Sequence, residues 1–479
     1  MADFGRSLVW FRRDLRASDH SALAAAMSQS SRGVIGLFVV DAAFWKQHHE
    51  AGVKIDFWLR NLAALKHRLE TLGVPLKLID TTSAPALPEA IVALARRLEC
   101  DTLHFHREYE VNEVARDRAV RAHCLEAGIK VCAYHDRVIL PPGSLRTGAG
   151  TPYGVFTPFR CAWEKLVAHT LDRVLPEPVA QPNLGIASDA LPDAVIGFAS
   201  HVPLESAYTL YPAGEAAAHA RLQRFIRTAA PAYVDGRNVP SHAGTSGLSP
   251  YLAAGVLSPR QCLEAASRAS NGRPFTTEGI STWISELCWR EFYTHLLCDY
   301  PRLSRGRPFK LATEAIEWRT SESDFIAWCE GKTGFPIVDS AMRAFNSTGF
   351  MHNRLRMIVA MFLTKDLLID WRRGEQFFMK HLIDGDLAAN NGGWQWSAST
   401  GTDAQPYFRI FNPTTQSETY DPKGKFIRQW LPELAHLDDK TLHDPHVRGA
   451  HLSVTTYPRP IVNHAKARLR AIATFKAIK

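Results

Sequence analysis

The chain has 479 residues, which at about 150 residues per domain predicts two or three domains. Its 46% hydrophobic and 22% charged residues are typical of a globular protein and exclude a disordered or fibrous one. The net charge of +8 favours a polyanionic partner, and the 12 Trp are compatible with stacking on bases or on a flat cofactor.

The eight cysteines show neither CxxC pairs nor metal-ligand spacing with histidine, so we expect a reducing compartment and no metal site. The sequence contains no run of 18 apolar residues, so no transmembrane span is predicted. The first residues lack the apolar core of a secretory signal. We therefore expect a cytoplasmic protein with no membrane partner.

From residue 7 to about 142, short apolar runs alternate with amphipathic stretches, which predicts an α/β domain over 1–140 with a parallel, doubly wound sheet. Strands are expected at 8–11, 34–40, 75–79, 102–106 and 130–134, and helices at 20–28, 54–72, 86–99 and 112–127. A ligand would lie at the carboxyl ends of the strands. Its identity stays open, because no GxGxxG follows the first strand.

Proline and glycine punctuate residues 141–212, which predicts an interdomain linker with one short helix at 158–169. From 213 to 479 the apolar period becomes 3.6 and strand signals disappear, so we expect an all-α domain. Its helices are predicted at 214–229, 259–268, 277–299, 323–330, 337–347, 350–370 and 374–382.

The first notable motif lies on the predicted helix 277–299, where Trp283, Glu286, Trp289, Arg290 and Tyr293 share one face. Taken alone, this face favours a core stripe with an ion pair at its edge. Two indoles beside a carboxylate, however, make a poor dry core. The same face suits the wall of a flat apolar cavity with one hydrogen-bond acceptor.

The segment GFMHNRLRM (349–357) carries two arginines on one predicted helix. Asn353 and Met357 are neighbours on that helix, whereas Arg354 and Arg356 lie about 200° apart. The two arginines therefore serve different surfaces, one facing an anion at the solvent side and the other facing inward. Without context, a solvated charge pair is the simpler interpretation.

Residues 382–413 are so rich in small, amide and indole side chains that we expect a ligand site there. Asp384 and Asp386 can cap a following helix. The run from Asn390 to Gly393 is expected to end that helix. Trp394 and Trp396 would then follow in an extended loop.

A weaker signal lies at AGTSGLSPYL (243–252), where Thr245, Ser246 and Ser249 surround Gly247 before a predicted helix. Backbone N–H groups in such a loop can cradle a phosphate, although an ordinary helix cap looks similar. No P-loop, GxSxG or HExxH motif occurs, so hydrolytic chemistry has no evident machinery. A cofactor would have to carry the reaction.

Five segments in the same order resemble the photolyase/cryptochrome family, and most closely class I cyclobutane pyrimidine dimer photolyases: WFRRDLR (10–16), TSGLSPYL (245–252), WISELCWREFY (283–293), FMHNRLRM (350–357) and DGDLAANNGGWQWSASTGTDAQPYFRIFNP (384–413). The resemblance covers nearly the whole chain. It implies light-driven repair of pyrimidine dimers in UV-damaged DNA. The dimer is flipped out of the duplex, a step already known for photolyases. Excited reduced FAD then gives it one electron, the two ring bonds open and the electron returns.

The resemblance also implies where FAD is held in the helical domain. Arg356 would pair with Asp384 beside the isoalloxazine, and Asn390 would meet the flavin N5. Gly247 departs from the basic residue that relatives often carry there, so one phosphate contact would be missing. The implied FAD contacts are Tyr233, Thr245, Ser246, Gly247, Leu248, Ser249, Trp283, Arg356, Asp384, Gly385, Asp386 and Asn390.

Three further residue sets follow from the same resemblance. The implied catalytic residues are Glu286, Trp289, Asn353, Met357, Asn390 and Trp396. The implied DNA contacts are Arg237, Glu286, Trp289, Arg290, Asn353, Arg354, Arg409 and Gln416. An electron-transfer chain to the surface would consist of Trp394, Trp371 and Trp318. Relatives that repair (6-4) photoproducts carry two histidines in place of Asn353 and Met357, which disfavours (6-4) repair here.

In the first domain, YEVNE (109–113) resembles the antenna signature of folate-binding members. Asn112 and Glu113, with His48 as a neighbour, would hold 5,10-methenyltetrahydrofolate, although a helix N-terminus capped by Asn is the structural alternative. Ser304 and Arg305 depart from the Cys-Lys pair of a close relative. We expect a monomer. The alternatives are a blue-light receptor of the same fold, a (6-4) photolyase, and a flavin- or nucleotide-binding protein without repair.

Overall fold

The computed structural model describes residues 4–84, 86–169, 174–449 and 456–478. Five parallel strands form one sheet in the order β3-β2-β1-β4-β5. The strands are β1 (Ser7–Phe11), β2 (Val34–Val40), β3 (Leu76–Asp80), β4 (Thr102–His106) and β5 (Lys130–Tyr134). Each predicted strand is confirmed to within one residue, because buried parallel strands leave short apolar runs in the sequence.

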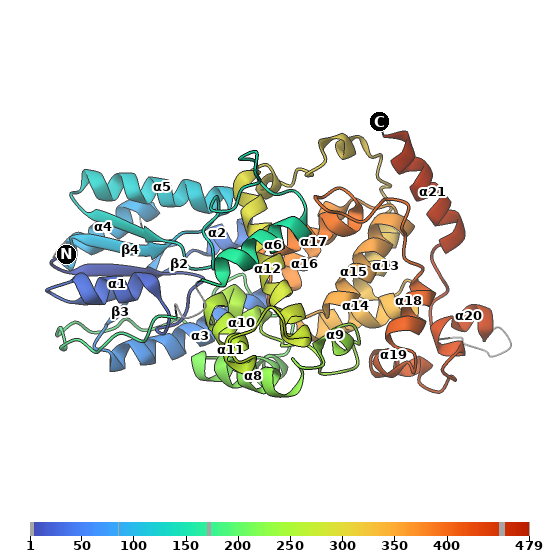
Figure 1. The fold of residues 1–479 in the computed structure, drawn as a ribbon, viewed down its shortest axis with the longest axis horizontal. Helices are drawn as coiled ribbons and strands as arrows, with labels where there is room; N and C mark the ends of the chain where they lie inside the picture. The colour runs from blue at the N-terminus through green and yellow to red at the C-terminus, as the bar shows by residue number, and fades with distance from the viewer. Residues whose placement is uncertain (1–3, 85, 170–173, 450–455, 479) are drawn as a thin grey trace.

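Helices cover both faces of this sheet, as a parallel sheet requires. They are α1 (Ser21–Gln29), α2 (Ala42–Gln47), α3 (Gly52–Thr71), α4 (Leu87–Arg97) and α5 (Val111–Glu126), of which only α2 was not predicted. Val9 and Phe11 of β1 belong to the core shared with α1 and α3, and Leu8 and Trp10 to the core shared with α4 and α5. Figure 1 shows α4 and α5 on one side of the sheet and α1 and α3 on the other. The predicted doubly wound α/β class is confirmed.

The segment 141–212 is anchored to the sheet through residues 181–189. It contains α6 (Phe156–Val167), close to the predicted helix, and α7 (Leu204–Leu210), which was not predicted. The Gln181 side chain exchanges two hydrogen bonds with the backbone of Val34 in β2, and Asp189 accepts one from the backbone of Leu78 in β3. The boundaries of this linker stay a prediction.

Helices and loops make up the described chain beyond residue 212. The helices are α8 (Glu215–Thr228), α9 (Tyr233–Gly236), α10 (Ser249–Ala254), α11 (Pro259–Ala269), α12 (Glu278–Asp299), α13 (Glu322–Glu330), α14 (Pro336–Thr348), α15 (Asn353–Met361), α16 (Trp371–His381), α17 (Leu387–Ala398), α18 (Pro413–Tyr420), α19 (Lys425–Trp430), α20 (Pro445–Arg448) and α21 (His464–Ala477). Short helical turns are η1 (Leu303–Arg305), η2 (Leu311–Ala315), η3 (Phe362–Asp366), η4 (Pro432–Leu434) and η5 (Thr441–His443). The all-α class predicted for this part is confirmed.

The predicted helix 350–370 is wrong in its extent. Helix α15 begins only at Asn353, passes into the π-helical turn η3, and the chain then turns at Leu368, whose φ is +52°. The residues from 361 to 369 are all buried, so an apolar period continues past the helix end. Periodicity alone cannot mark that end.

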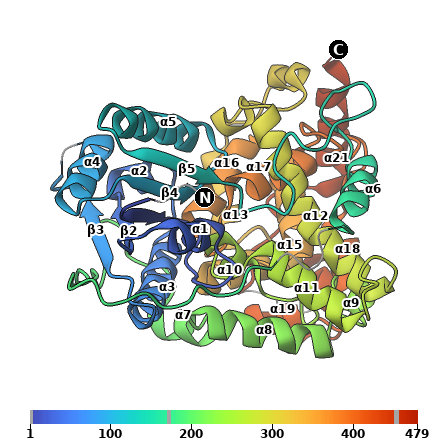
Figure 2. The same cartoon turned by 60° about the vertical axis from the view of Figure 1, so that its left-hand side comes forward.

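One hydrophobic core continues from the sheet into the helical part. It includes Phe11 of β1, Trp58 of α3, Tyr251 of α10 and Trp283 of α12. Figure 2 shows α10 lying against the sheet and its helices at this junction. A second core fills the space among α13 to α19. Within the described ranges, no helix is long and apolar enough to cross a membrane.

Candidate functional site

The predicted pair between Arg356 and Asp384 is confirmed. Arg356 of α15 donates from Nη2 to Asp384 at 2.8 Å, and the Ser249 hydroxyl at the start of α10 donates to the same carboxylate at 2.6 Å. The other arginine of the motif, Arg354, donates instead to Asn238 at 2.8 Å. The two arginines thus face different surfaces, as their 200° separation predicts.

Asp386 caps α17, accepting a hydrogen bond from the backbone of Ala389 at 3.1 Å. Its carboxylate also lies 2.8 Å from Arg137, in the chain that leaves β5. Burial pushes the pKa of Asp386 upward, but Arg137 and Arg290 overcome this and hold it at about 2. Asp386 is therefore ionised at neutral pH. The sheet domain thus contributes directly to the acidic loop.

Lys54 and Arg290 make two contacts at this loop that the sequence did not predict. Lys54 of α3 is fully buried and donates to the carbonyl of Gly385 at 2.6 Å. Arg290 donates to the carbonyl of Arg137 at 2.5 Å and has Asp386 as its electrostatic partner. This position beside the acidic loop disfavours the DNA contact that we predicted for Arg290.

Helix α17 corrects another expectation, because it does not end at Asn390–Gly393. It continues to Ala398 and closes at Ser399, whose φ is +66°. Gly392 serves packing: a Cβ there would lie 2.3 Å from the ring of Tyr293 on α12. Trp394 and Trp396 are consequently helical and not in an extended loop. Two residues apart on a helix, they face different sides, Trp394 buried and Trp396 half-buried.

The two asparagines of α17 are fixed by Glu375 of α16. Asn390 donates its side-chain amide to the Glu375 carbonyl at 3.0 Å, and Asn391 donates to the Glu375 carboxyl at 2.8 Å. The Asn390 side-chain oxygen is thereby kept as an acceptor. Burial raises the pKa of Glu375 to about 7, against the hydrogen bond from Asn391, which lowers it.

Replacing Glu375 with Gln should remove a pH-dependent loss of stability. The folded pKa of about 7 exceeds the ordinary 4.5, so the contribution of this group is present below pH 4.5 and is lost as pH rises through 7. Relative to the Gln variant, the wild-type free energy of unfolding should fall by roughly 3 kcal/mol between pH 4 and pH 8. Urea unfolding at several pH values measures this. The exposed Glu322→Gln is the control, and parallel pH profiles for wild type and Glu375→Gln would contradict the prediction.

Two predicted side chains of α12, Glu286 and Trp289, are held by residues of neighbouring elements. Glu286 lies 2.8 Å from Arg237, just after α9. Burial raises the pKa of Glu286, with Arg237 opposing that shift. Trp289 stacks on Phe156 of α6, with 3.6 Å between ring centroids and 7° between planes. One indole face is thus supported from behind.

Tyr233 and Trp283 are brought together by a shared neighbour. Both contact Phe225 of α8, at ring-centroid distances of 5.7 and 5.0 Å. The loop 245–249 precedes α10 and lies beside the acidic loop through Ser249. Gly247 in this loop has φ +60°, a conformation that glycine adopts without strain. The predicted FAD-contact residues therefore converge from α9, α10, α12, α15 and α17.

A basic cluster lies beside Glu286. His352, which caps α15, has its pKa lowered to about 4 by burial and then by Arg354, Arg356 and Arg237. Arg354 also lies over the ring of Tyr420 at 4.3 Å. Asn353 is exposed and Met357 half-buried at this cluster.

Several buried polar atoms in this region lack a hydrogen-bond partner. They are His352 Nε2, Arg354 Nε and Gln416 Oε1. Buried polar groups are normally satisfied, so a concentration of unsatisfied ones fits a site that a ligand completes. Arg409, predicted as a DNA contact, is exposed.

The three predicted electron-transfer tryptophans lie in or against the second core. Trp371 and Trp394 are buried members of that core, and Trp318 is half-buried against it. Trp318 also meets Phe475 of α21 at 6.2 Å between ring centroids. Gly374 allows Trp394 to pack against α16, because a Cβ there would lie 2.1 Å from the indole.

The predicted antenna residues lie together at the carboxyl ends of the strands. Asn112 Nδ2 is 3.0 Å from His48 Nε2, and Glu113 is 3.9 Å from the same ring nitrogen. A cavity of about 50 Å³ extends from the carboxyl ends of β1 and β2 to Glu113. The buried Glu113 Oε2 has no partner, and burial raises the pKa of this carboxyl to about 8.

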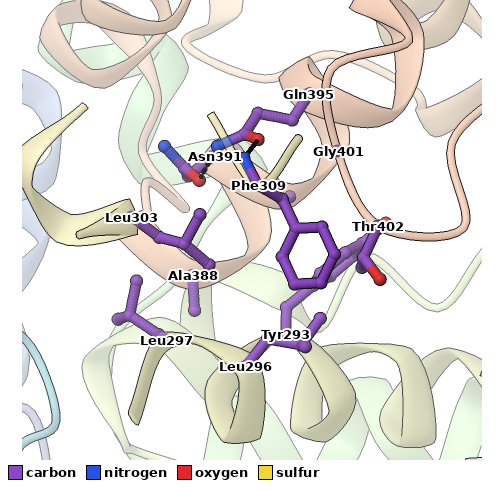
Figure 3. A pocket seen from close by; sticks show the side chains of 11 residues that line it. Tyr293, Leu296, Leu297, Leu303, Phe309, Ala388, Asn391, Gln395, Gly401 and Thr402 are labelled. Atoms are coloured by element: carbon purple, nitrogen blue, oxygen red, sulfur yellow. Dashed lines mark hydrogen bonds between the residues drawn. The ribbon is translucent and has the colours of Figure 1, made fainter. Parts of the chain in front are cut away.

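A second cavity, between α12 and α17, belongs to the scaffold. Its volume is about 20 Å³, enough for about one water molecule. Figure 3 shows Gln395 bridging this space, donating to Asn391 and accepting from the Phe309 backbone, each at 2.8 Å. Its size excludes a flavin.

One cluster in the described ranges has metal-ligand spacing, formed by Asp14, His20 and His106. Three of the four ring nitrogens already have a hydrogen-bond partner, and the fourth, His20 Nε2, lies 3.4 Å from Asp14. His106 lies 2.7 Å from Asp14 and accepts from the backbone of Ala22, and His20 accepts from the backbone of Leu23. We therefore assign the cluster to a buried hydrogen-bond network.

Comparisons with known proteins agree with this geometry. The family described as "DNA photolyase" matches residues 7–182, and that described as "FAD binding domain of DNA photolyase" matches residues 283–477. A deoxyribodipyrimidine photo-lyase of Escherichia coli is 45% identical, with 98% of each chain covered. A class III photolyase of Agrobacterium tumefaciens superposes with a TM-score of 0.86 at 34% identity, covering 100% of this chain and 98% of the other. A Synechocystis cryptochrome superposes with a TM-score of 0.86 at 30% sequence identity, covering 100% of each chain. The chain belongs to the DNA photolyase family.

Proposed function

We propose that this protein repairs cyclobutane pyrimidine dimers in DNA, driven by light and with FAD as its catalytic cofactor. The observation that carries the proposal is the cluster formed by the Arg237–Glu286 ion pair with His352 and Arg354. His352 Nε2 and Arg354 Nε are buried there without a hydrogen-bond partner, and His352 has Arg356 of the Arg356–Asp384 pair as an electrostatic neighbour. When bound and reduced, FAD supplies the electron that light delivers to the dimer. Asp384, Arg356 and Asn390 would hold its ring system.

Glu286 is the group that responds to charge on the substrate. Burial raises the pKa of Glu286 and so favours the protonated carboxyl, the form that would donate a hydrogen bond to a pyrimidine carbonyl as that oxygen gains negative charge. Arg237 orients the carboxyl at 2.8 Å. Trp289, braced by Phe156, would offer its free face to the fused pyrimidine rings, and Trp396, Asn353 and Met357 would complete the cavity.

DNA would approach across the basic cluster. Arg237 and Arg354 lie close enough to influence each other's charge, and a phosphate between them would relieve that repulsion. We propose Gln416 and Arg409 as further contacts to the DNA. Because all these residues come from one chain, repair needs no second copy, and we propose a monomer. The eight free cysteines support a cytoplasmic location.

A repair assay tests this function. Reduced protein is mixed with an oligonucleotide that carries one thymine dimer and is exposed to near-UV light. We expect restoration of a restriction site that spans the dimer, with no restoration in the dark or with a (6-4) photoproduct. Dimers that persist in the light would overturn the proposal. They would favour a blue-light receptor, because this chain also has the fold of a cryptochrome.

We also propose a folate antenna at Asn112, Glu113 and His48. A pterin presents an N–H and an amino group side by side, and a carboxyl group is the usual partner for such a pair. The unsatisfied Oε2 of Glu113 supports this assignment. The half-exposed position of His48 above it supports access from solvent.

Replacing Glu113 with Ala should weaken 5,10-methenyltetrahydrofolate binding at least tenfold, because a buried charge-assisted contact contributes roughly 1.5–3 kcal/mol. The near-UV band of the folate should disappear from the purified protein while the flavin spectrum stays intact. Glu126→Ala, at the exposed end of the same helix, should keep both. A folate band that survives in Glu113→Ala would place the antenna elsewhere.

A further inference from the structure

Arg221 of α8 reaches into the loop that contains Gly247. A Cβ added to Gly247 would lie 2.6 Å from Nη1 of Arg221, so the guanidinium occupies the space that a side chain at 247 would need. Helix α8 is thus the source of a positive charge inside the loop 245–249. The sequence offered no sign of this, because 26 residues separate the two positions.

The contacts of Arg221 fix its position without neutralising it. Nη2 donates to the carbonyl of Leu210 at 2.5 Å. The guanidinium lies 6.0 Å from the ring of Tyr211 and 5.8 Å from that of Tyr251. Among the described residues, no carboxylate lies within ion-pair distance of it, whereas most other half-buried arginines near this site have one. A half-buried guanidinium with only neutral partners is suited to an anion from outside the chain.

Tyr211 connects Arg221 to the charged residues of the proposed flavin site. Tyr211 has Arg221, Asp384 and Arg356 as electrostatic neighbours, so these three charged groups lie around one side chain. Asp384 is already paired with Arg356 and hydrogen-bonded by Ser249. Asp384, the carboxylate hydrogen-bonded to this loop, therefore does not pair with Arg221, and the Arg221 guanidinium stays available to an anion at Gly247.

We propose that Arg221 binds the diphosphate of FAD and that Gly247 is small because the Arg221 guanidinium lies against it. The missing basic side chain at 247 is thereby replaced by one from α8. This inference rests on the proposed function and adds a residue that positions the cofactor. Bidentate geometry suits an arginine to two neighbouring phosphate oxygens.

The test measures FAD affinity directly, by titrating apoprotein with FAD and following the loss of flavin fluorescence. Arg221→Gln should raise the dissociation constant at least tenfold. Arg227→Gln, an exposed position on the same helix, removes the same charge and should change it less than twofold. The double variant R221Q/G247R returns the charge from the loop side and should recover part of the lost affinity, although the positive φ at 247 imposes some strain.

The outcomes separate the two levels of the proposal. FAD binding by Arg221→Gln as tight as by wild type overturns the role of Arg221 and leaves the proposed function standing. A wild-type apoprotein that takes up no FAD overturns the proposed function itself. Thermal unfolding of the apoproteins shows whether a variant is folded, and a weakened Arg221→Gln that R221Q/G247R fails to improve argues against a phosphate contact.

Discussion

Replacing Trp318 with Phe should slow the photoreduction of bound, oxidised FAD at least tenfold, while repair by chemically reduced protein stays unchanged. Trp318 is half-buried, whereas Trp371 and Trp394 lie fully inside the second core. If the three indoles conduct electrons inward, Trp318 is the one that solvent reductants can restore. A phenyl ring is far harder to oxidise than an indole, so it interrupts the chain without emptying the space.

Trp328 provides the matched control for this experiment. It contacts Trp394 at 6.0 Å between ring centroids, but it is fully buried and donates to the carbonyl of Val359. An electron hole on Trp328 has no route to solvent. Trp328→Phe should therefore keep the photoreduction rate, as followed by flavin absorbance under blue light with a thiol reductant. Unchanged photoreduction in Trp318→Phe, or joint loss of photoreduction and repair, would contradict the chain.

Replacing Trp289 with Ala should weaken binding to dimer-containing DNA by about 1–3 kcal/mol, or roughly 5- to 150-fold. The indole stacks on Phe156 at 3.6 Å, which fixes its plane and leaves one face for the lesion. Truncation removes that face and also leaves Phe156 exposed to the cavity. Binding to intact DNA, which depends on phosphate contacts, should change little.

The Trp289→Phe variant tests whether stacking is the cause. A phenyl ring can still lie between Phe156 and the lesion, so Phe should retain most of the affinity that Ala loses. Filter binding or fluorescence anisotropy with damaged and intact oligonucleotides measures both constants. Equal losses for the two DNAs would assign Trp289 to the fold and not to the lesion.

Periodicity predicted the sheet well because each strand is a short, largely apolar run, and the three central strands β1, β2 and β4 are buried along their whole length. It failed where packing, not propensity, decides the backbone. Gly392 and Gly393 look like a helix end, yet α17 continues through them because Tyr293 fills the space beside Gly392. The short helix α10, with the loop before it, gives too few residues for a period to register.

The candidate site was predictable where its residues are close in sequence. The opposite directions of Arg354 and Arg356 follow from helical geometry alone. Residues contributed by distant elements carried no comparable signal. Glu375 becomes visible only once α16 packs against α17, and Arg221 only once α8 meets the loop before α10. Arg290 is a similar case, since nothing in the sequence indicated its hydrogen bond to the carbonyl of Arg137 in the sheet domain, and its DNA contact stays a prediction.

Lys54 and Arg137 both belong to the sheet domain, and both hold the loop that carries Gly385 and Asp386. Deleting the first third of the chain would leave that loop without two of its supporting cations. The sheet domain would therefore be needed at this loop even in a protein without an antenna pigment.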